Sequence, residues 1–198
     1  NFSKKLSLNG FKRQRQTDAS LIRIYFRYIC VQNRSMYTEY QPSHLLVPYI
    51  DSYWEFKGNP DYGMRIHILP DGCTDFIFTL GEVANAVEEG SLIMQPYRSY
   101  FVGPMTKYSE LVTYTESIHM FGVRFLPCGL SCFTNLPLHE FVNSRVSTNE
   151  MKAVFDDTFI EKLGEQKHVT DRIRVVEEYL LAYLARHYQP ADSHVAMA

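Results

Sequence analysis

Between residues 40 and 127 the hydrophobic residues form short runs separated by turn residues, a pattern typical of β-strands. The run over 64–69 alternates apolar and polar side chains, which predicts a strand with one face in the core. Most of the other runs are rich in aromatic and β-branched residues and predict buried strands. The predicted strands cover 51–56, 64–69, 73–80, 92–102, 109–115 and 118–126.

Beyond the last predicted strand the hydrophobic period lengthens from two to about 3.6 residues, which indicates helices. The pattern predicts a helical turn over 129–134. A helix is predicted over 149–163, because Ser147 and Glu150 have the spacing of a capping box and a glycine follows. A longer helix is predicted over 170–187. Strands followed by helices predict an α+β fold.

The last predicted helix carries two neighbouring lines of apolar residues. One side could pack on the chain's own strands while the other meets a partner. The alternative is that the whole helix packs inside one molecule. The first line follows a 3.5-residue repeat and consists of Val169, Ile173, Val176, Leu180, Tyr183 and His187.

Charge divides the 198 residues into two unequal parts. Residues 1–35 carry eight Lys and Arg against one acidic residue, whereas residues 36–198 carry 12 basic and 21 acidic residues, a net charge of −9. A domain this negative repels a phosphate backbone, so we do not expect it to bind nucleic acid by itself. We interpret 1–35 as a basic extension ahead of the domain. A nucleic-acid-binding arm, or a strand over 21–31 added to the sheet, is the alternative.

Composition excludes several classes of protein. No run approaches the 18 to 20 or so apolar residues of a membrane helix. Four cysteines in a chain of this length suggest no disulfide framework, and no signal-peptide pattern opens the sequence, so we expect a cytoplasmic location. Because metal-site spacings, nucleophile motifs and nucleotide-binding loops are missing from the sequence, we expect no metal, no cofactor and no enzymatic activity.

Trp54, His67 and Arg124 are the candidates for contact with a small ligand. A small β-barrel encloses about one ligand, between apolar walls and a few polar groups. Trp54 could supply an apolar wall. His67 and Arg124, like Asp75, are polar residues in strand-like apolar runs, where a polar group without a partner would be costly to bury. The structural alternative is that Asp71 and Asp75 bind backbone amides of a turn and that Arg124 pairs with one of them.

Three short motifs recur in one order beside these runs. They are Leu-Pro-Asp-Gly at 69–72, Phe-Val-Gly-Pro at 101–104, and Gly-Val-Arg-Phe at 122–125, with a proline and a glycine close behind. In this combination the chain resembles the amino-terminal domain of AraC-type bacterial transcription regulators, over about 40–188. It departs from the family pattern at Cys128, where we expect a glycine.

The resemblance implies a fold, a partner and a ligand. The fold is a cupin-like β-barrel followed by two or three helices, spanning 36–190, with an unknown small-molecule effector in the barrel. The resemblance also implies a homodimer formed through the C-terminal helix, and DNA contact only through two helix-turn-helix units that these residues do not include. We interpret 191–198 as the beginning of that part. The residues expected at the dimer contact are Ile173, Val176, Leu180 and Tyr183.

Two other functions remain open from the sequence. One is a cupin-type enzyme acting on a small molecule, with or without a metal ion. The other is a dimerisation module whose barrel is filled by its own aromatic side chains, since the chain contains 13 Phe and 14 Tyr.

Overall fold

A computed structural model describes residues 36–68, 70–81, 86–87, 94–151, 154–155 and 157–187. The chain divides into two compact units, 1–34 and 35–198, and all described residues belong to the second. The basic segment 1–35, with the possible strand over 21–31, and the segment 191–198 lie outside the described residues.

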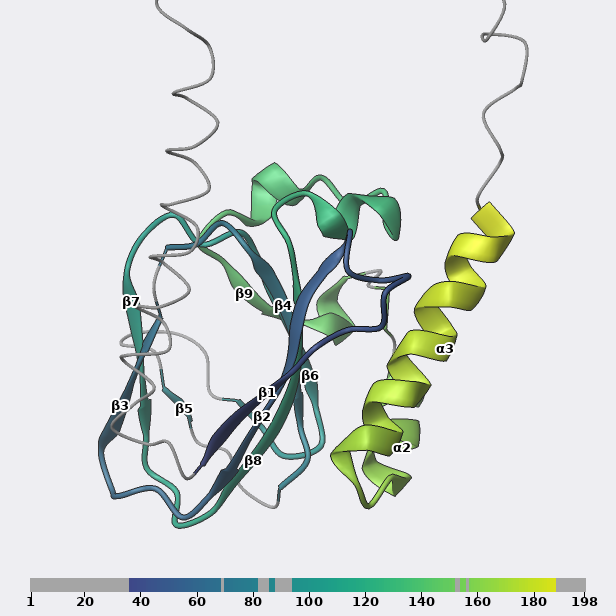
Figure 1. The fold of residues 1–198 in the computed structure, drawn as a ribbon. Coiled ribbons are helices and arrows are strands. Elements are labelled where there is room, and N and C mark those ends of the chain that lie inside the picture. The colour runs from purple at the N-terminus through teal and green to yellow at the C-terminus, as the bar shows by residue number, and fades with distance from the viewer. Residues whose placement is uncertain are drawn as a thin grey trace, which may run out of the picture. The chain divides into compact units, whose positions relative to one another are not determined.

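The described strands form two antiparallel sheets (Figure 1). The larger has six strands in the order β1-β2-β8-β4-β6-β9, and the smaller has three in the order β3-β7-β5. The described strands therefore make two separate hydrogen-bonded sheets, without a ladder that closes them into one barrel. The six strands in spatial order are β1 (Tyr37–Tyr40), β2 (Ile50–Gly58), β8 (Ile118–Phe125), β4 (Thr74–Thr79), β6 (Ser99–Val102) and β9 (Arg145–Ser147). The other three are β3 (Met64–Ile68), β7 (Ser109–Thr113) and β5 (Ala86–Val87).

Each predicted strand is present, and one is much shorter than predicted. The run over 92–102 becomes a strand only at Ser99. Residues 96 and 97 form a turn. Tyr97 has a φ of 53°, in the left-handed region, and Pro96 cannot donate a hydrogen bond to a neighbouring strand. Hydrophobicity alone does not reveal this interruption, because the residues on both sides of it are apolar.

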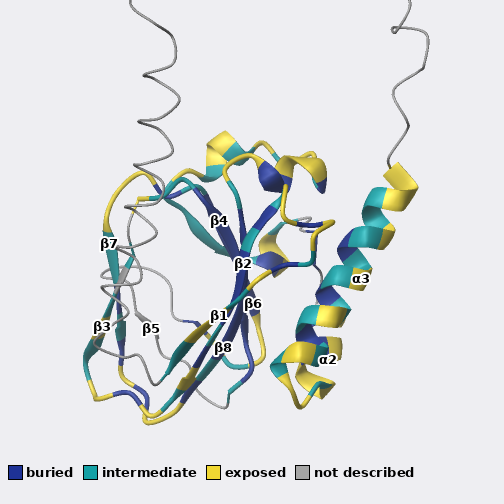
Figure 2. Ribbon diagram, viewed as in Figure 1, coloured by how far each residue is buried: buried dark blue, intermediate teal, exposed yellow. Residues whose placement is uncertain are grey.

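The six-stranded sheet is buried on both faces, so its central strands are almost entirely buried (Figure 2). Side chains alternate between the two faces. One face packs an aromatic cluster, including Phe76, Phe78 and Phe121, against the C-terminal helices. The opposite face, called here the inner face, packs against the three-stranded sheet through a second cluster that includes Trp54 and Leu111.

Two helices follow the strands, α2 (Asp157–Glu165) and α3 (Val169–His187). The start of α2 corrects the predicted helix over 149–163. Residues Thr148–Glu150 form only a short 3₁₀ turn, and the Ser147 side chain makes no capping hydrogen bond. The buried Thr148 hydroxyl bonds instead to the Ser99 hydroxyl and backbone on β6. This tertiary contact holds the segment against the sheet, where the local pattern predicted a helix start.

Helix α3 packs its predicted apolar line on the chain's own aromatic cluster. Val176 and Leu180 are both 0% exposed and belong to this cluster, while Ile173 and Tyr183 are partly buried against it. The expectation that Val176 and Leu180 contact a second copy is therefore corrected: they stabilise the fold and present no surface to a partner. Among the described helices, none is long and apolar enough to cross a membrane.

Cys128 occupies a backbone conformation that favours glycine. Its φ is 66° and its ψ is −4°, in the left-handed region, and it precedes the 3₁₀ turn Gly129–Cys132. For a residue with a side chain this conformation costs about 1–2 kcal/mol. The glycine that the AraC-type pattern led us to expect at this position is thus also the residue that the backbone conformation favours.

We predict that Gly122→Ala lowers the free energy of unfolding by about 1–3 kcal/mol or more, the cost of overpacking a core. A Cβ atom at this position would lie 1.9 Å from Cε2 of Trp54, which faces Gly122 directly across the β2–β8 ladder. Gly164→Ala is the matched control, because a Cβ there, in α2, meets nothing within 4 Å. The control should raise stability by about 0.5–1 kcal/mol. Urea denaturation measures both, and equal effects would contradict the prediction.

Candidate ligand-binding site

Four polar side chains meet on the inner face of the six-stranded sheet. The Arg124 guanidinium donates from Nε to both carboxylate oxygens of Asp75, at 3.2 Å each. Its Nη1 atom lies 3.4 Å from Oδ2 of Asp71. Trp54 donates its indole N–H to Oδ1 of Asp75 at 2.9 Å. Asp75 is therefore the junction of the cluster, which we call the Asp75 cluster.

The three sequence motifs fold together to build this cluster. Asp71 comes from the first motif and Arg124 from the third. Asp75 pairs directly with Arg124 on β8 and with Val102, from the second motif, on β6. Directly opposed residues in an antiparallel ladder project to the same face, which places the Asp75 carboxylate beside the guanidinium. Asp71 is held by its turn, because its Oδ1 accepts the backbone N–H of Cys73 at 2.9 Å.

Trp54, the only tryptophan of the chain, lies across a glycine. Its indole occupies the space above Gly122 that any side chain would fill. On the edge strand, the Tyr37 ring lies with its centroid 6.1 Å from the indole, tilted by 31°. Because the indole N–H is fixed on Asp75, Trp54 fluorescence reports directly on the cluster.

The electrostatics of the cluster are unbalanced toward negative charge. Burial alone would lower the pKa of the Arg124 guanidinium, but Asp75 and Asp71 outweigh burial and raise it, so this residue is a permanent cation. Burial raises the pKa of the Asp71 carboxyl, and the charges of Asp75 and Asp51 add to that effect. Arg124 and the N–H of Cys73 oppose the shift and do not cancel it. Adding negative charge here is therefore unfavourable.

One buried hydroxyl beside the cluster has no hydrogen-bond partner. Ser52 pairs directly with Arg124 across the β2–β8 ladder, so its side chain lies on the same inner face. The residue is 2% exposed, and its Oγ makes no hydrogen bond. Buried hydroxyls nearly always find a partner, so an unpartnered one beside charged groups indicates a place for a group from outside the chain.

The cluster also borders solvent. The side chains of Arg124 and Asp75 are each 10% exposed, and that of Asp71 is 14% exposed. These fractions are small, but they belong to neighbouring groups on one face.

The structure brings together two of the three predicted ligand residues. Trp54 and Arg124 meet at Asp75, in the ion pairing that the structural alternative anticipated. His67 lies on β3 opposite Glu110 of β7, and its side chain is outside the described residues. Sequence reasoning gave Asp75 only a structural role and passed over Ser52. A serine inside an otherwise apolar strand is the one signal that could have drawn attention to it.

A second polar junction ties the opposite face of the same sheet to the helices. Oε1 of Glu55 on β2 accepts from Arg172 of α3 at 3.2 Å and lies 2.9 Å from Nε2 of His119 on β8. Arg172 is buried, and it also donates to the carbonyl oxygens of Leu163 at 3.2 Å and Gln166 at 2.6 Å, at the end of α2. One guanidinium thus joins β2, α2 and α3.

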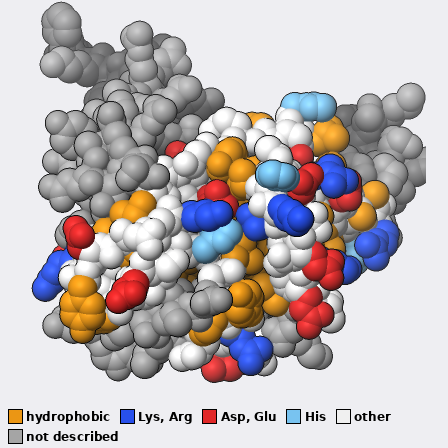
Figure 3. Space-filling view, turned by 90° about the horizontal axis from the view of Figure 1, so that it is seen from below, with side chains coloured by type: hydrophobic (Ala, Val, Ile, Leu, Met, Phe, Trp, Pro, Cys, Tyr) orange, Lys and Arg blue, Asp and Glu red, His pale blue; other side chains and the backbone are white. Residues whose placement is uncertain are grey.

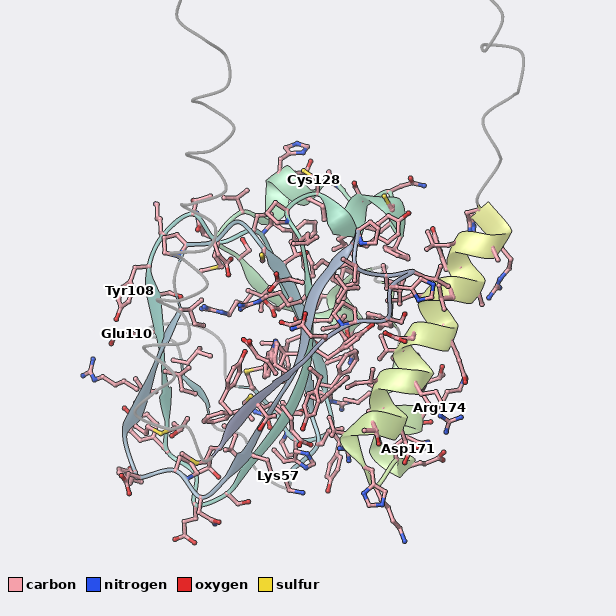
Figure 4. All side chains as sticks on the ribbon, in the orientation of Figure 1. Lys57, Tyr108, Glu110, Cys128, Asp171 and Arg174 are labelled. Atoms are coloured by element: carbon pink, nitrogen blue, oxygen red, sulfur yellow. The ribbon has the colours of Figure 1, made fainter. Side chains whose placement is uncertain are left out.

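The outer surfaces carry charges of both signs. Arg174 lies on the side of α3 away from the sheets and pairs with Asp171 at 3.5 Å (Figure 4). Tyr108 donates to Glu110 on the three-stranded sheet, and both are labelled in the same view. Seen from below, Lys and Arg side chains lie among Asp and Glu side chains (Figure 3). The face in that view therefore shows no uninterrupted basic patch of the kind that grips a phosphate backbone.

The family model described as Domain of unknown function (DUF6597) matches residues 38–147, more than half of the chain. The chain belongs to this family. No curated protein matches the sequence.

The DUF6597 match runs from β1 to the end of β9. It includes every residue of the Asp75 cluster, and it ends before α2 and α3 begin. Among the described residues of the chain, no three His, Cys, Asp or Glu side chains are grouped so that they could hold a metal ion.

We predict that Arg124→Met lowers the free energy of unfolding of this DUF6597 domain by about 3–5 kcal/mol. The substitution leaves the carboxylates of Asp71 and Asp75 buried without their cation. Arg65→Met is the control, because the Arg65–Glu110 pair is exposed and such pairs contribute only about 0–1 kcal/mol. Chemical denaturation of both variants checks the difference, and a loss below about 1 kcal/mol for Arg124→Met would contradict the analysis.

We also predict that the domain loses stability as the pH falls through the titration of His119. Burial lowers the pKa of this imidazole, against the opposing effect of its hydrogen bond to the Glu55 carboxylate. Between that lowered pKa and the unfolded value of about 6.5, the unfolded chain binds more protons than the folded one. The free energy of unfolding therefore falls with pH across this window and levels off below it.

Denaturation of the wild type and His119→Gln between pH 8 and pH 5 or so measures this effect. The variant should show a shallower dependence, whereas His139→Gln, at an exposed position in the 3₁₀ turn Leu138–Phe141, should follow the wild type. Identical curves for the wild type and His119→Gln would show that the imidazole is not the titrating group.

Proposed function

We propose that this chain is the ligand-sensing and dimerisation domain of an AraC-like transcription regulator. A small effector binds at the Asp75 cluster, and α3 transmits the binding to helix-turn-helix units of the kind that accompany this domain in such regulators. The order of the three motifs supports the family, and their meeting at one cluster supports a shared site. The proposal assigns these residues a binding role and no catalytic step.

The observation that carries the proposal is the alternation of three consecutive residues on β2. Trp54 points to the inner face and bonds to Asp75. Tyr53 and Glu55 point to the other face, where both contact α3. The Tyr53 hydroxyl donates to Glu177 at 3.3 Å, and Glu55 accepts from Arg172 at 3.2 Å. A displacement of β2 at the site therefore acts on two points of the helix.

Glu177 extends this connection to the segment ahead of β2. Its Oε1 also accepts the backbone N–H of Ser43 at 2.7 Å. The segment ahead of β2 and the middle of β2 are thus both held to α3 by carboxylate hydrogen bonds, which are stronger than neutral ones. An effector that fits one position of β2 better than another would shift the equilibrium between the two corresponding positions of α3. The free energy of that shift cannot exceed the difference between the effector's binding free energies for the two positions.

The proposal extends to the barrel and the dimer. The two sheets enclose the inner face in the manner of a cupin-like barrel, with the effector between them. The dimer forms through α3 with twofold symmetry. Because Val176 and Leu180 are buried in the chain's own core, the contact uses the outward side of the helix, together with the exposed parts of Ile173 and Tyr183.

A ligand screen followed by hydrogen exchange tests the sensing function. We expect at least one small molecule to raise the melting temperature, to change Trp54 fluorescence, and to change amide protection in α3. In Glu55→Gln the same compound should still change Trp54 fluorescence, while its effect on α3 should fall, because the bond to Arg172 loses its charge.

Glu116→Gln is the matched control, since Glu116 is exposed in the connection between β7 and β8 and should leave the response of α3 intact. Binding without any change in α3 would contradict the relay, and a screen without any binder would contradict sensing. Sedimentation equilibrium tests the dimer separately, and a monomer at every accessible concentration would remove that part of the proposal.

A further inference from the structure

The inner face offers its ligand an excess of negative charge. Arg124 is a single cation, and it is shared by Asp75, with Nε 3.2 Å from both oxygens, and Asp71, with Nη1 3.4 Å from one. The charge of Asp51 reaches the same place, because it contributes to the raised pKa of Asp71. Among the residues that the structure describes, carboxylates therefore outnumber guanidinium groups in the Asp75 cluster.

A second observation is independent of this count. The Ser52 hydroxyl is 2% exposed, lies next to Arg124 on the inner face, and has no hydrogen-bond partner. A hydroxyl can accept a hydrogen bond as well as donate one. The Ser52 hydroxyl is thus able to accept a hydrogen bond from a ligand beside the carboxylates.

The aromatic side chains favour the same sign of ligand. The rings of Trp54 and Tyr37 lie 6.1 Å apart beside the carboxylates, and the faces of such rings attract cations. An anionic ligand would find the one guanidinium already facing two carboxylates, and it would meet their charge at low local dielectric.

We propose that the ligand of the Asp75 cluster is a small organic cation carrying N–H donors, a primary ammonium or a guanidinium compound. Its N–H groups bond to the Asp71 carboxylate and the Ser52 hydroxyl, and its charge offsets the excess of carboxylates around Arg124. This inference rests on the proposed sensing function and specifies the class of its effector.

Titration of Trp54 fluorescence with a charge series tests the inference on the whole chain. The probes are ethyl, butyl and cyclohexyl compounds, each as the ammonium, the alcohol and the carboxylate, so that size is held constant while charge changes. We expect at least one ammonium compound to bind about tenfold or more tighter than its alcohol and carboxylate counterparts, the effect of a charged hydrogen bond.

Two variants connect the binding to the named residues. Asp71→Asn should weaken binding of the ammonium compound by about tenfold or more, while Asp61→Asn, the same change at an exposed loop carboxylate, should leave it unchanged. Ser52→Ala keeps the fold testable if Asp71→Asn is unstable, because removing an unpartnered hydroxyl breaks no hydrogen bond. It should weaken binding about threefold or more.

The outcomes separate this inference from the proposed function. Tighter binding of an alcohol or carboxylate, or ammonium binding that both variants leave unchanged, would overturn the cation assignment and leave sensing intact. If no ammonium compound binds while the broader screen yields neutral or anionic ligands, the assignment is also wrong. If no compound of any class binds, the sensing proposal falls with it.

Discussion

Burial of the Arg124 guanidinium is the constraint on which the inner face of the sheet depends. A guanidinium cannot give up its proton in a protein, so the chain has to supply compensating charge wherever it buries one. The turn at 70–73 supplies Asp71 and the strand that follows it supplies Asp75. Both carboxylates reach the guanidinium only if β4 and β8 pair in the observed register. The ion cluster therefore fixes the register of the central strands and the position of Trp54 together.

The same sheet has to serve two surfaces of different chemistry. Its inner face combines the charged cluster with methionine, aliphatic and aromatic side chains, while its outer face packs phenylalanine and aliphatic side chains under the helices. Hydrogen bonds of Glu55 and Glu177 connect the sheet with α3 among the described residues, and both lead to β2. β2 is therefore the strand that connects the Asp75 cluster on the inner face with α3 on the outer face.

Most of the strands could be predicted from the sequence, because apolar–polar alternation and turn residues are signals carried by neighbouring residues. The beginning of α2 was not predictable, since a hydroxyl bond from Thr148 to β6 outweighs a capping signal made of neighbouring residues. The 3.5-residue repeat of α3 identified which residues share a face. It could not tell whether Val176 meets another copy or the chain's own core, because both partners are equally apolar.

The site shows the same division between local and distant information. Trp54 stood out as an aromatic wall and Arg124 as a polar group in an apolar run, yet their shared contact with Asp75 depends on two long-range strand pairings that no local pattern encodes. Glu55 and Trp54 lie within the segment that the DUF6597 family model matches, whereas Arg172 lies beyond it. The segment that defines the family thus carries the cluster and the outward contacts of β2, and the helices that receive those contacts lie outside it. The Asp75 cluster and the contacts with α3 are joined through a single strand, because adjacent residues of β2 face opposite sides of the sheet.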